Sequence, residues 1–305
     1  MTQLTAAIDL GTNTALLLVA RRTSAGGLEV VEELCRTPRL GSGLARRTTL
    51  DPEACARAQA VLHEYRARLA ALGVDLSRVR VVGTACLRRA TDGAAWAQHM
   101  RTVTGVPLEV LSEEDEARLS ALAVSAEGVG PEAVVIDVGG GSTEVGCEAL
   151  DLRQSRPMGA VVLTETYLGA EPLQPGGYPA LWAHAQAQAA HFPRGIAAGR
   201  TVVAVGGTGV NLACLQAKLT RFDPHAVEGA ELDAHSVAAL ARDLASLSLD
   251  ERRALPIEAE RAEVLPAGLA CLAATLEQLS ASRFRITGRG LRYGVIRDLW
   301  KSLPA

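Results

Sequence analysis

Two short apolar runs, one in each half of the chain, are followed by nearly the same polar pattern. The first is Ala7-Ile8-Asp9-Leu10-Gly11-Thr12-Asn13-Thr14, and the second is Val135-Ile136-Asp137-Val138-Gly139-Gly140-Gly141-Ser142-Thr143-Glu144. An apolar run of this length that is bounded by glycine predicts a buried strand. The Asp places a carboxylate at the mouth of the strand, and the glycines allow backbone N–H groups to turn inward toward an anion. The matched pair predicts two similar half-molecules that face each other across a cleft, and the alternative is two unrelated tight turns.

The rest of the first half predicts strands and helices in alternation. Asp51-Pro52 has the pattern of a helix start, with proline in the first helical position. Ser112 followed three residues later by Asp115 has the pattern of a helix cap, so the next helix begins with consecutive acids. The predicted elements of this half are strands at 6–8, 16–20, 28–31, 79–84 and 108–111 and helices at 52–72, 94–103 and 113–127.

The second half repeats this order more loosely and begins with another run of three strands. Helical stretches, two further strands and a closing helix follow. The predicted elements are strands at 134–137, 144–149, 153–158, 202–205 and 283–287 and helices at 180–192, 208–218, 233–246, 260–281 and 293–299. No linker or low-complexity segment interrupts the chain, and we expect the domain boundary near 118–132.

Composition narrows the class of protein. The chain has 305 residues, of which 48% are hydrophobic, and is long enough for two packed domains. No stretch is apolar enough to span a bilayer, and the N-terminal sequence lacks the pattern of a secretory signal. Six scattered cysteines without a Cys-x-x-Cys pair predict buried, reduced thiols, so a soluble cytoplasmic protein is expected. A net charge of −3 and an aromatic content of 3% argue against nucleic-acid binding.

Further short motifs are distributed along most of the chain, in a fixed order. They are the segments 7–14, 39–44, 83–90, 112–119, 135–145, 205–209, 260–263 and 290–294. Together they resemble the exopolyphosphatase and guanosine-pentaphosphate phosphatase family, within the actin-like ATPase superfamily. The family pattern is specific because it requires all of these pieces in this order.

The resemblance implies an α/β fold. It consists of two ribonuclease-H-like (actin-like ATPase) domains with mixed five-stranded sheets and a cleft between them. The implied N-terminal domain covers 1–125 and the C-terminal domain 126–291, and a final helix at about 292–305 packs back on the N-terminal domain. The chain ends soon after that helix, so we expect the short two-domain form of the family.

The implied reaction is hydrolysis of a terminal phosphoanhydride by direct attack of water. The transition state of such a transfer is loose, so catalysis depends on amides, on cations and on one base that orients the water. The resemblance places the catalytic glutamate at Glu116, with Asp115 as a second candidate. The alternative for both acids is that they stabilise the first turn of their helix through its macrodipole.

Carboxylates around a phosphate repel it unless a hard divalent cation lies between them. Mg²⁺ fits this role because it takes oxygen ligands and keeps several waters. The candidate metal ligands are Asp137, Glu144 and Asp9, and the alternative is that Asp9 and Asp137 cap their own turns. Arginine supplies nearly all of the positive charge, and its fork suits phosphate oxygens. The candidate phosphate-binding residues are Gly11, Thr12, Asn13, Thr14, Gly139, Gly140, Gly141, Ser142, Thr143, Arg88, Arg39, Gly207 and Thr208.

The leading hypothesis is a Mg²⁺-dependent exopolyphosphatase, and three alternatives stay open. They are a guanosine pentaphosphate (pppGpp) 5′-phosphohydrolase, a superfamily kinase with nucleotide at 205–209, and a non-catalytic sensor of polyphosphate or an alarmone. Asp92, Glu263 and Tyr293 depart from the residues that the family commonly has, which leaves substrate preference open. We expect the chain to bind neither nucleic acids nor membranes. A homodimer is possible.

Overall fold

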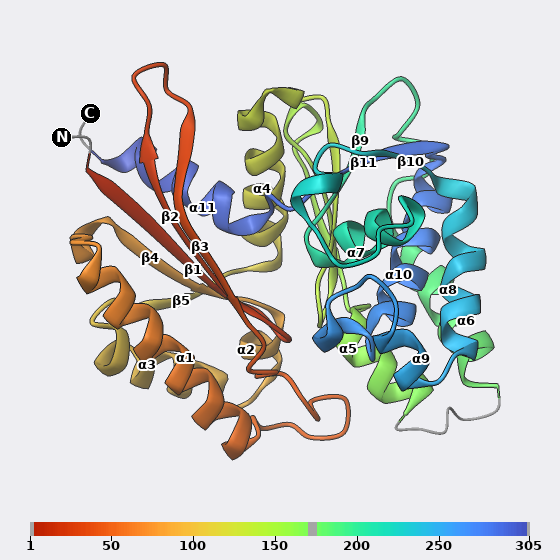
Figure 1. Cartoon of the computed structure of the whole chain (residues 1–305), viewed down its shortest axis with the longest axis horizontal. Helices are drawn as coiled ribbons and strands as arrows, with labels where there is room; N and C mark the ends of the chain where they lie inside the picture. Colours follow the sequence, from red (N-terminus) through yellow and green to blue (C-terminus); the bar gives the residue numbers. More distant parts are fainter. Residues whose placement is uncertain (1–2, 170–175, 304–305) are drawn as a thin grey trace.

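The computed structural model describes residues 3–169 and 176–303. Two β-sheets lie side by side, helices cover their outer faces, and a pair of helices lies between them (Figure 1). We name the half built on the first sheet lobe I and the half built on the second sheet lobe II. None of the helices in the described ranges combines the length and the apolarity needed to cross a membrane.

Lobe I is a mixed five-stranded sheet in the order β3-β2-β1-β4-β5. The central strand β1 pairs antiparallel with β2 and parallel with β4, so it is hydrogen-bonded on both sides. The strands are β1 (Leu4–Leu10), β2 (Ala15–Arg22), β3 (Leu28–Arg36), β4 (Val79–Gly83) and β5 (Leu108–Val110). The helices of this half are α1 (Pro52–Ala71), α2 (Ala85–Arg89), α3 (Gly93–Thr104) and α4 (Glu113–Val124).

Both predicted helix starts in lobe I are confirmed. Asp51 accepts hydrogen bonds from the N–H groups of Glu53 and Ala54, at 2.9 and 3.0 Å, and Pro52 occupies the first turn of α1. Ser112 Oγ accepts a hydrogen bond from the N–H of Asp115 at 3.1 Å at the start of α4. These caps satisfy N–H groups that have no partner inside the helix.

Alternation along β1 decides which side chains face which helices. Ile8 and Leu10 lie in the core that the sheet forms with α1 and α3. Ala7 lies in a second core, on the opposite face, which the sheet forms with α4 and α11 (Leu291–Ser302). Because side chains alternate across a strand, Asp9 projects from the same face as Ala7, at the end of the strand.

Lobe II has a six-stranded sheet in the order β10-β11-β9-β6-β7-β8, so the expectation of five strands is wrong by one. The extra edge strand β10 pairs antiparallel with β11, where the sequence predicted the start of a helix at 233. Asp233 caps the turn that follows it by accepting from the N–H of His235 at 2.8 Å. The strands are β6 (Val134–Val138), β7 (Thr143–Cys147), β8 (Leu152–Arg156), β9 (Val202–Val205), β10 (Glu231–Asp233) and β11 (Arg283–Thr287).

In lobe II, local chemistry explains where the helix α10 begins. The helix predicted at 260–281 begins only at Leu265, because Pro266 lacks an N–H and is tolerated in a first turn but not further inside a helix. The helices are α5 (Ala160–Leu163), α6 (Gly177–Ala189), α7 (Gly207–Gln216), α8 (Val237–Ser246), α9 (Leu249–Arg253) and α10 (Leu265–Leu279).

Helix α4 lies between the two sheets, beside α11 (Figure 1). On one side, Leu119 packs in the core of lobe I. On another side, Ala121 and Val124 pack against Val135 and its neighbours in lobe II. Apolar surface from both lobes therefore fixes the position of the α4 helix and of everything at its N-terminus.

Cysteine burial differs from the sequence expectation at two positions. All six cysteines are free thiols, and four of them are buried. Cys35 is exposed and Cys55 is half-buried, so the expectation that all six are buried is wrong. Cys35 lies on β3, the edge strand of lobe I, which explains its access to solvent.

The contact of α11 with α4 depends on a glycine. A Cβ atom on Gly294 would lie 1.8 Å from the carbonyl oxygen of Leu119. Gly294→Ala should therefore lower the free energy of unfolding by about 3 kcal/mol, as overpacking of a core does. Urea denaturation measures this difference.

The matched control is Gly288→Ala, because a Cβ atom at Gly288 would meet its nearest neighbour at an ordinary 3.6 Å. We expect the control to change stability by less than about 0.5 kcal/mol. Equal stability of the two variants would show that the α4–α11 contact is looser than the structure indicates.

Candidate active site

The two repeated motifs form two similar turns. Gly11 N–H donates to the carbonyl of Thr14 at 2.8 Å, and Gly139 N–H donates to the carbonyl of Ser142 at 3.0 Å. Each turn connects the first two strands of its lobe, β1 to β2 and β6 to β7. The same sequence pattern therefore gives the same local structure twice.

The two turns touch each other across the lobes. A Cβ atom on Gly140 would lie 2.9 Å from Thr12 Cβ, and one on Gly141 would lie 2.8 Å from Thr12 Oγ1. These glycines therefore permit the close approach of the lobes. The first turn is held in addition by the N–H of Arg39, which donates to the carbonyl of Asn13 at 3.0 Å.

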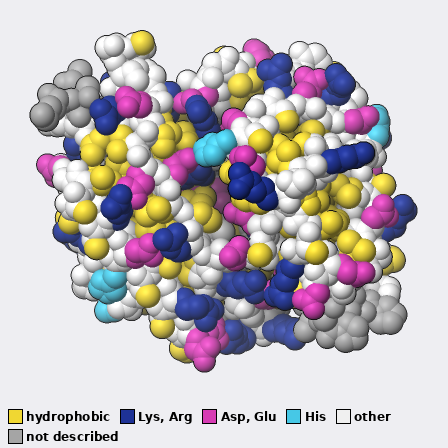
Figure 2. All heavy atoms as spheres, viewed as in Figure 1, with side chains coloured by type: hydrophobic (Ala, Val, Ile, Leu, Met, Phe, Trp, Pro, Cys, Tyr) yellow, Lys and Arg dark blue, Asp and Glu magenta, His cyan; other side chains and the backbone are white. Residues whose placement is uncertain are grey.

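A cleft of about 90 Å³ lies between the lobes at these turns. On the face seen in Figure 2, acidic and basic side chains gather along the hollow between the two lobes. The lining residues include the predicted Asp9, Gly11, Thr12, Asn13, Thr14, Glu116, Asp137, Gly139, Gly140, Gly141, Ser142 and Gly207. The structure thus brings most of the predicted site residues together around one cavity.

Three acids converge on this cleft, and a fourth lies behind them. Asp9 comes from the end of β1 and Asp137 from the end of β6, and Glu116 comes from the first turn of α4. Glu144 lies directly opposite Asp137 in the antiparallel β6–β7 pair, but it is only 1% exposed and does not line the cavity. Ser120 of α4 donates to Asp137 Oδ2 at 2.8 Å, and Ser155 donates to Glu144 Oε1 at 2.8 Å.

Several buried polar atoms of this group have no partner in the described part of the chain. They are the acceptors Asp9 Oδ1 and Glu144 Oε2 and the donor Asn13 Nδ2. A buried polar group without a partner costs free energy, and a bound ligand can supply the missing partner. Acceptors suit a cation and the amide donor suits an anion, which together describe a metal–phosphate ligand.

Burial raises the pKa of every acid in the group, and the charges of neighbouring acids add to the rise at Asp9, Glu116 and Glu144. Burial, followed by the charges of Glu116 and Asp137, raises the pKa of Asp9 to about 8. Burial raises the pKa of Asp137 to about 6, against the hydrogen bond from Ser120. The pKa of Glu144 lies well above its usual value because of burial and the charges of Glu116 and Asp137. Acids with such shifts are typical of catalytic and ligand-binding sites.

Glu116 has an arginine partner. Arg88 Nη1 donates to Glu116 Oε2 at 2.7 Å and to the carbonyl of Leu111 at 2.9 Å. Burial raises the pKa of Glu116 to about 7, and the charge and hydrogen bond of Arg88 oppose this rise. Arg88 therefore holds the carboxylate at the start of α4 and keeps it able to release its proton near neutral pH.

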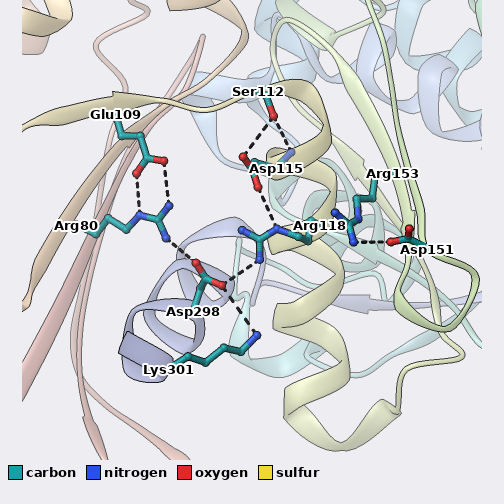
Figure 3. Close-up of polar contacts among 9 residues, drawn as sticks. All are labelled: Arg80, Glu109, Ser112, Asp115, Arg118, Asp151, Arg153, Asp298 and Lys301. Atoms are coloured by element: carbon teal, nitrogen blue, oxygen red, sulfur yellow. Dashed lines mark hydrogen bonds and ion pairs between the residues drawn. The ribbon is translucent and has the colours of Figure 1, made fainter. Parts of the chain in front are cut away.

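Asp115 lies outside the cleft and belongs to an ion-pair network (Figure 3). Arg118 Nε contacts Asp115 Oδ1 at 3.0 Å, and Arg118 Nη1 contacts Asp298 Oδ1 at 3.0 Å. Asp298 also contacts Arg80 of β4 at 2.8 Å. The network ties the start of α4 to α11 and to lobe I, so the contacts of Asp115 are those of a structural residue.

Four further predicted residues lie outside the cavity. Arg39 pairs with Glu263 at 2.9 Å and so links lobe I to lobe II. Thr143 donates to the carbonyl of Met158 at 2.6 Å, and Thr208 donates to the carbonyl of Val138 at 3.4 Å. Together with Arg88, these residues line no part of the cleft.

Two cleft arginines were given no role by the sequence analysis. Arg261 and Arg292 both line the cavity, and their charges lower the pKa of Asp137. A Cβ atom on Gly207 would lie 2.2 Å from Arg261 Cζ, so glycine at 207 admits the guanidinium. Both arginines lie inside motifs of the sequence, at 260–263 and 290–294. Membership in these motifs is the feature of the sequence from which a role for them could have been predicted.

The predicted metal ligands fit a cation only with help from a substrate. In the ranges 3–169 and 176–303, no three Asp, Glu, His or Cys side chains form a group spaced to hold a metal ion. The unpartnered oxygen atoms of Asp9 and Glu144 are nevertheless the donor type that Mg²⁺ prefers. Mg²⁺ is commonly held by one or two carboxylates together with substrate phosphates and water, and this arrangement fits the residues present.

Two ribonuclease-H-like lobes with a cleft at the ends of their central strands define an actin-like ATPase fold, as the sequence predicted. The chain matches the model of the Ppx/GppA phosphatase family over residues 18–303. It belongs to this family, which confirms the resemblance drawn from the motifs.

Similar proteins of known name cover nearly all of the chain. A guanosine-5′-triphosphate,3′-diphosphate pyrophosphatase of Vibrio vulnificus is 30% identical over 303 residues, which are 98% of this chain and 59% of the relative. The chain thus spans little more than half of that protein. The Aquifex aeolicus member of the Ppx/GppA family is 27% identical with a TM-score of 0.80, and both chains are covered completely. An exopolyphosphatase-like protein is 25% identical with a TM-score of 0.85, over 99% of this chain and 100% of the other.

The pKa of Asp9 makes stability depend on pH. Below about pH 3.8 the carboxyl is protonated in both the folded and the unfolded chain. As the pH rises toward about 8, the unfolded chain releases this proton and the folded chain keeps it, so the free energy of unfolding falls. Asp9→Asn should therefore raise this free energy by about 2 kcal/mol or more near pH 9, and by less near pH 5.

Urea denaturation in EDTA at both pH values measures the effect. The control is Asp243→Asn, because that carboxylate is 68% exposed and lies on the surface. A pH-independent gain in Asp9→Asn, or an equal gain in the control, would contradict the assigned pKa shift.

Proposed function

We propose that the protein hydrolyses the terminal phosphoanhydride bond of a polyphosphorylated substrate. The observation that carries this proposal is that two buried atoms of residues lining the cleft, Asn13 Nδ2 and Asp9 Oδ1, have no hydrogen-bond partner among the described residues. The amide donor can bind an anion and the carboxylate oxygen can bind a cation, both in the same cleft. Family membership and the names of the relatives support the same chemistry.

The terminal phosphate would lie between the two glycine-rich turns. Backbone N–H groups of such turns bind phosphate oxygens, and Asn13 adds a side-chain donor. Arg261 and Arg292 line the same cavity and offer charge to the next phosphates of the chain. Binding between turns of two lobes fixes the phosphorus atom relative to the attacking water, which is the main task in phosphoryl transfer.

Glu116 is the proposed base. It lines the cleft from the start of α4, is 7% exposed, and has a pKa raised to about 7 by burial. A carboxylate with this pKa can orient a water and accept its proton at neutral pH. Arg88 holds the carboxylate in place through its 2.7 Å hydrogen bond.

Asp9 and Asp137 are the proposed ligands of a divalent cation, with Glu144 behind them. Bound Mg²⁺ would neutralise the phosphate oxygens and the surrounding carboxylates. Ser120 orients Asp137, and Ser155 orients Glu144, through the hydrogen bonds described above.

Inorganic polyphosphate is the leading substrate. It consists only of phosphoanhydride-linked phosphates, so the cleft needs nothing beyond phosphate-binding groups to recognise it. Arg46 and Arg47, in the loop that follows β3, line neither the cleft nor the side pocket, and Arg47 is paired with Asp51 at 2.7 Å. The phosphate-binding charge of the cleft therefore comes from Arg261 and Arg292.

Substitution of the proposed base gives a direct test. Glu116→Gln keeps the size of the side chain but cannot accept a proton, so the rate of phosphate release from polyphosphate should fall by about 10²-fold or more. The measurement is steady-state release of inorganic phosphate in the presence of Mg²⁺.

The control for this test comes from the same helical turn. Glu114→Gln removes an acid that is exposed at the start of α4 and lines neither the cleft nor the side pocket, so it should leave the rate within about twofold. Full activity in Glu116→Gln would exclude Glu116 as the base. Equal losses in both variants would favour a role of the acids in helix stability alone.

Guanosine pentaphosphate is a second candidate substrate, and a specific cavity favours it. A side pocket of about 470 Å³ adjoins the cleft, and the two cavities share Leu16, Gly206, Gly207, Arg261 and Arg292. Apolar and aromatic side chains line it, among them Leu34, Phe222, Pro224 and Tyr293. A nucleoside in the side pocket could place its 5′-phosphates in the cleft, and the Vibrio vulnificus relative is named for this nucleotide.

Cys35 lines the side pocket and is exposed, so its alkylation reports on occupancy. In the Glu116→Gln variant with Mg²⁺, saturating guanosine pentaphosphate should slow alkylation of Cys35 by iodoacetamide about tenfold, because bound nucleotide covers the thiol. Long-chain polyphosphate should leave the rate unchanged. Mass spectrometry of the modified peptides measures both rates.

Cys55 supplies the internal control, because it is half-buried on α1 and lies outside both cavities. Its alkylation should not respond to either compound. If guanosine pentaphosphate leaves Cys35 unprotected, or polyphosphate protects it equally, the nucleoside does not bind in the side pocket.

A further inference from the structure

Glu33 of β3 gathers three donors on one oxygen atom. Arg292 donates to Glu33 Oε1 from Nε at 3.1 Å and from Nη2 at 2.6 Å. Tyr293 Oη donates to the same oxygen at 2.9 Å. The acceptor belongs to lobe I, and both donors belong to the start of α11, which follows lobe II in the chain.

These contacts fix the plane and the direction of the Arg292 guanidinium. The Tyr293 ring is buried, and its centroid lies 5.1 Å from Arg292 Cζ. Nε and Nη2 form one edge of the planar fork, so binding them to Glu33 turns the opposite edge away from Glu33. Within the described residues Nη1 has no hydrogen-bond partner, and it is therefore the part of the group left for a ligand.

Arg292 borders both the cleft and the side pocket. A phosphate chain whose end lies between the two glycine-rich turns would reach this border with the phosphates that follow the terminal one. Its second and third phosphates would then lie at Arg292. Arg292 is thus placed to bind the part of the substrate that leaves after hydrolysis.

We propose that Glu33 is a positioning residue, which aims Arg292 at the phosphates that follow the terminal one. This inference rests on the proposed function and deepens it, since it concerns how the same cleft holds its phosphoanhydride chain. A purely structural ion pair is the alternative, and it predicts an effect on stability without an effect on substrate binding.

The chain offers a closely matched control on the same strand. Glu32 also accepts an ion pair from an arginine, Arg68, at 2.6 Å. Arg68 lies on α1, in the layer on the far side of the sheet from α11, so this pair has the same chemistry without access to the cleft. Glu32→Gln and Glu33→Gln therefore remove equivalent charges at adjacent positions of β3.

The test is steady-state hydrolysis of polyphosphate, together with calorimetric binding of tripolyphosphate to proteins that also carry Glu116→Gln. Glu33→Gln should raise KM about tenfold and weaken tripolyphosphate binding to a similar degree, with kcat within about twofold. Glu32→Gln should match the wild type in both measurements. Arg292→Lys should resemble Glu33→Gln, and the double variant should be no worse than either single variant.

Tyr293→Phe is a milder variant, and it tests the same interaction if Glu33→Gln does not fold. It removes one of the three donors and should raise KM by about two- to threefold. Unchanged KM and binding in Glu33→Gln, with normal hydrolysis by the wild type, would overturn the role of Glu33 and leave the proposed function standing. Weakened tripolyphosphate binding in Glu33→Gln, with no hydrolysis by the wild type, would support the role of Glu33 and overturn the hydrolase.

Discussion

The site depends on one constraint, which is that α4 is buried between two sheets while its first turn carries an acid. Apolar contacts on both sides of the helix fix where Glu116 lies. Burial of several carboxylates in one place is unfavourable, because each loses hydration and repels the others. The packing of α4 offsets this cost and keeps the acids together. The structure is therefore stable with its acids crowded, and a ligand that brings both a cation and an anion relieves the repulsion.

Much of the fold follows from local sequence patterns. Asp9 and Asp137 end up on the faces that meet α4 because side chains alternate along β1 and β6, and the strand ends are marked by Gly11 and Gly139. The helix caps at Asp51 and Ser112 are equally local. In contrast, the three residues of β10 alternate polar, apolar and polar, but the run is too short to predict a strand, and only its pairing with β11 makes it one.

In the site as well, the residues that could be predicted are those whose role depends on neighbours in the sequence. The two glycine-rich turns and the acid of α4 could be named from their motifs. The role of Arg292 could not, because its partner Glu33 lies 259 positions away in the sequence and no spacing rule connects them. The same holds for Arg39 and Glu263, which meet across the lobes. Motifs indicated which segments matter, and tertiary contacts decide what each side chain faces.

The place of α11 has a consequence for how the chain reaches its native state. This helix covers Ala7, Leu18 and Val82 of lobe I, yet in sequence it follows all of lobe II. During synthesis, the first sheet leaves the ribosome long before the segment that covers its second face. Contacts between such distant segments form late and slowly, and an uncovered apolar face favours aggregation. Lobe I therefore becomes complete only after lobe II, although it is made first.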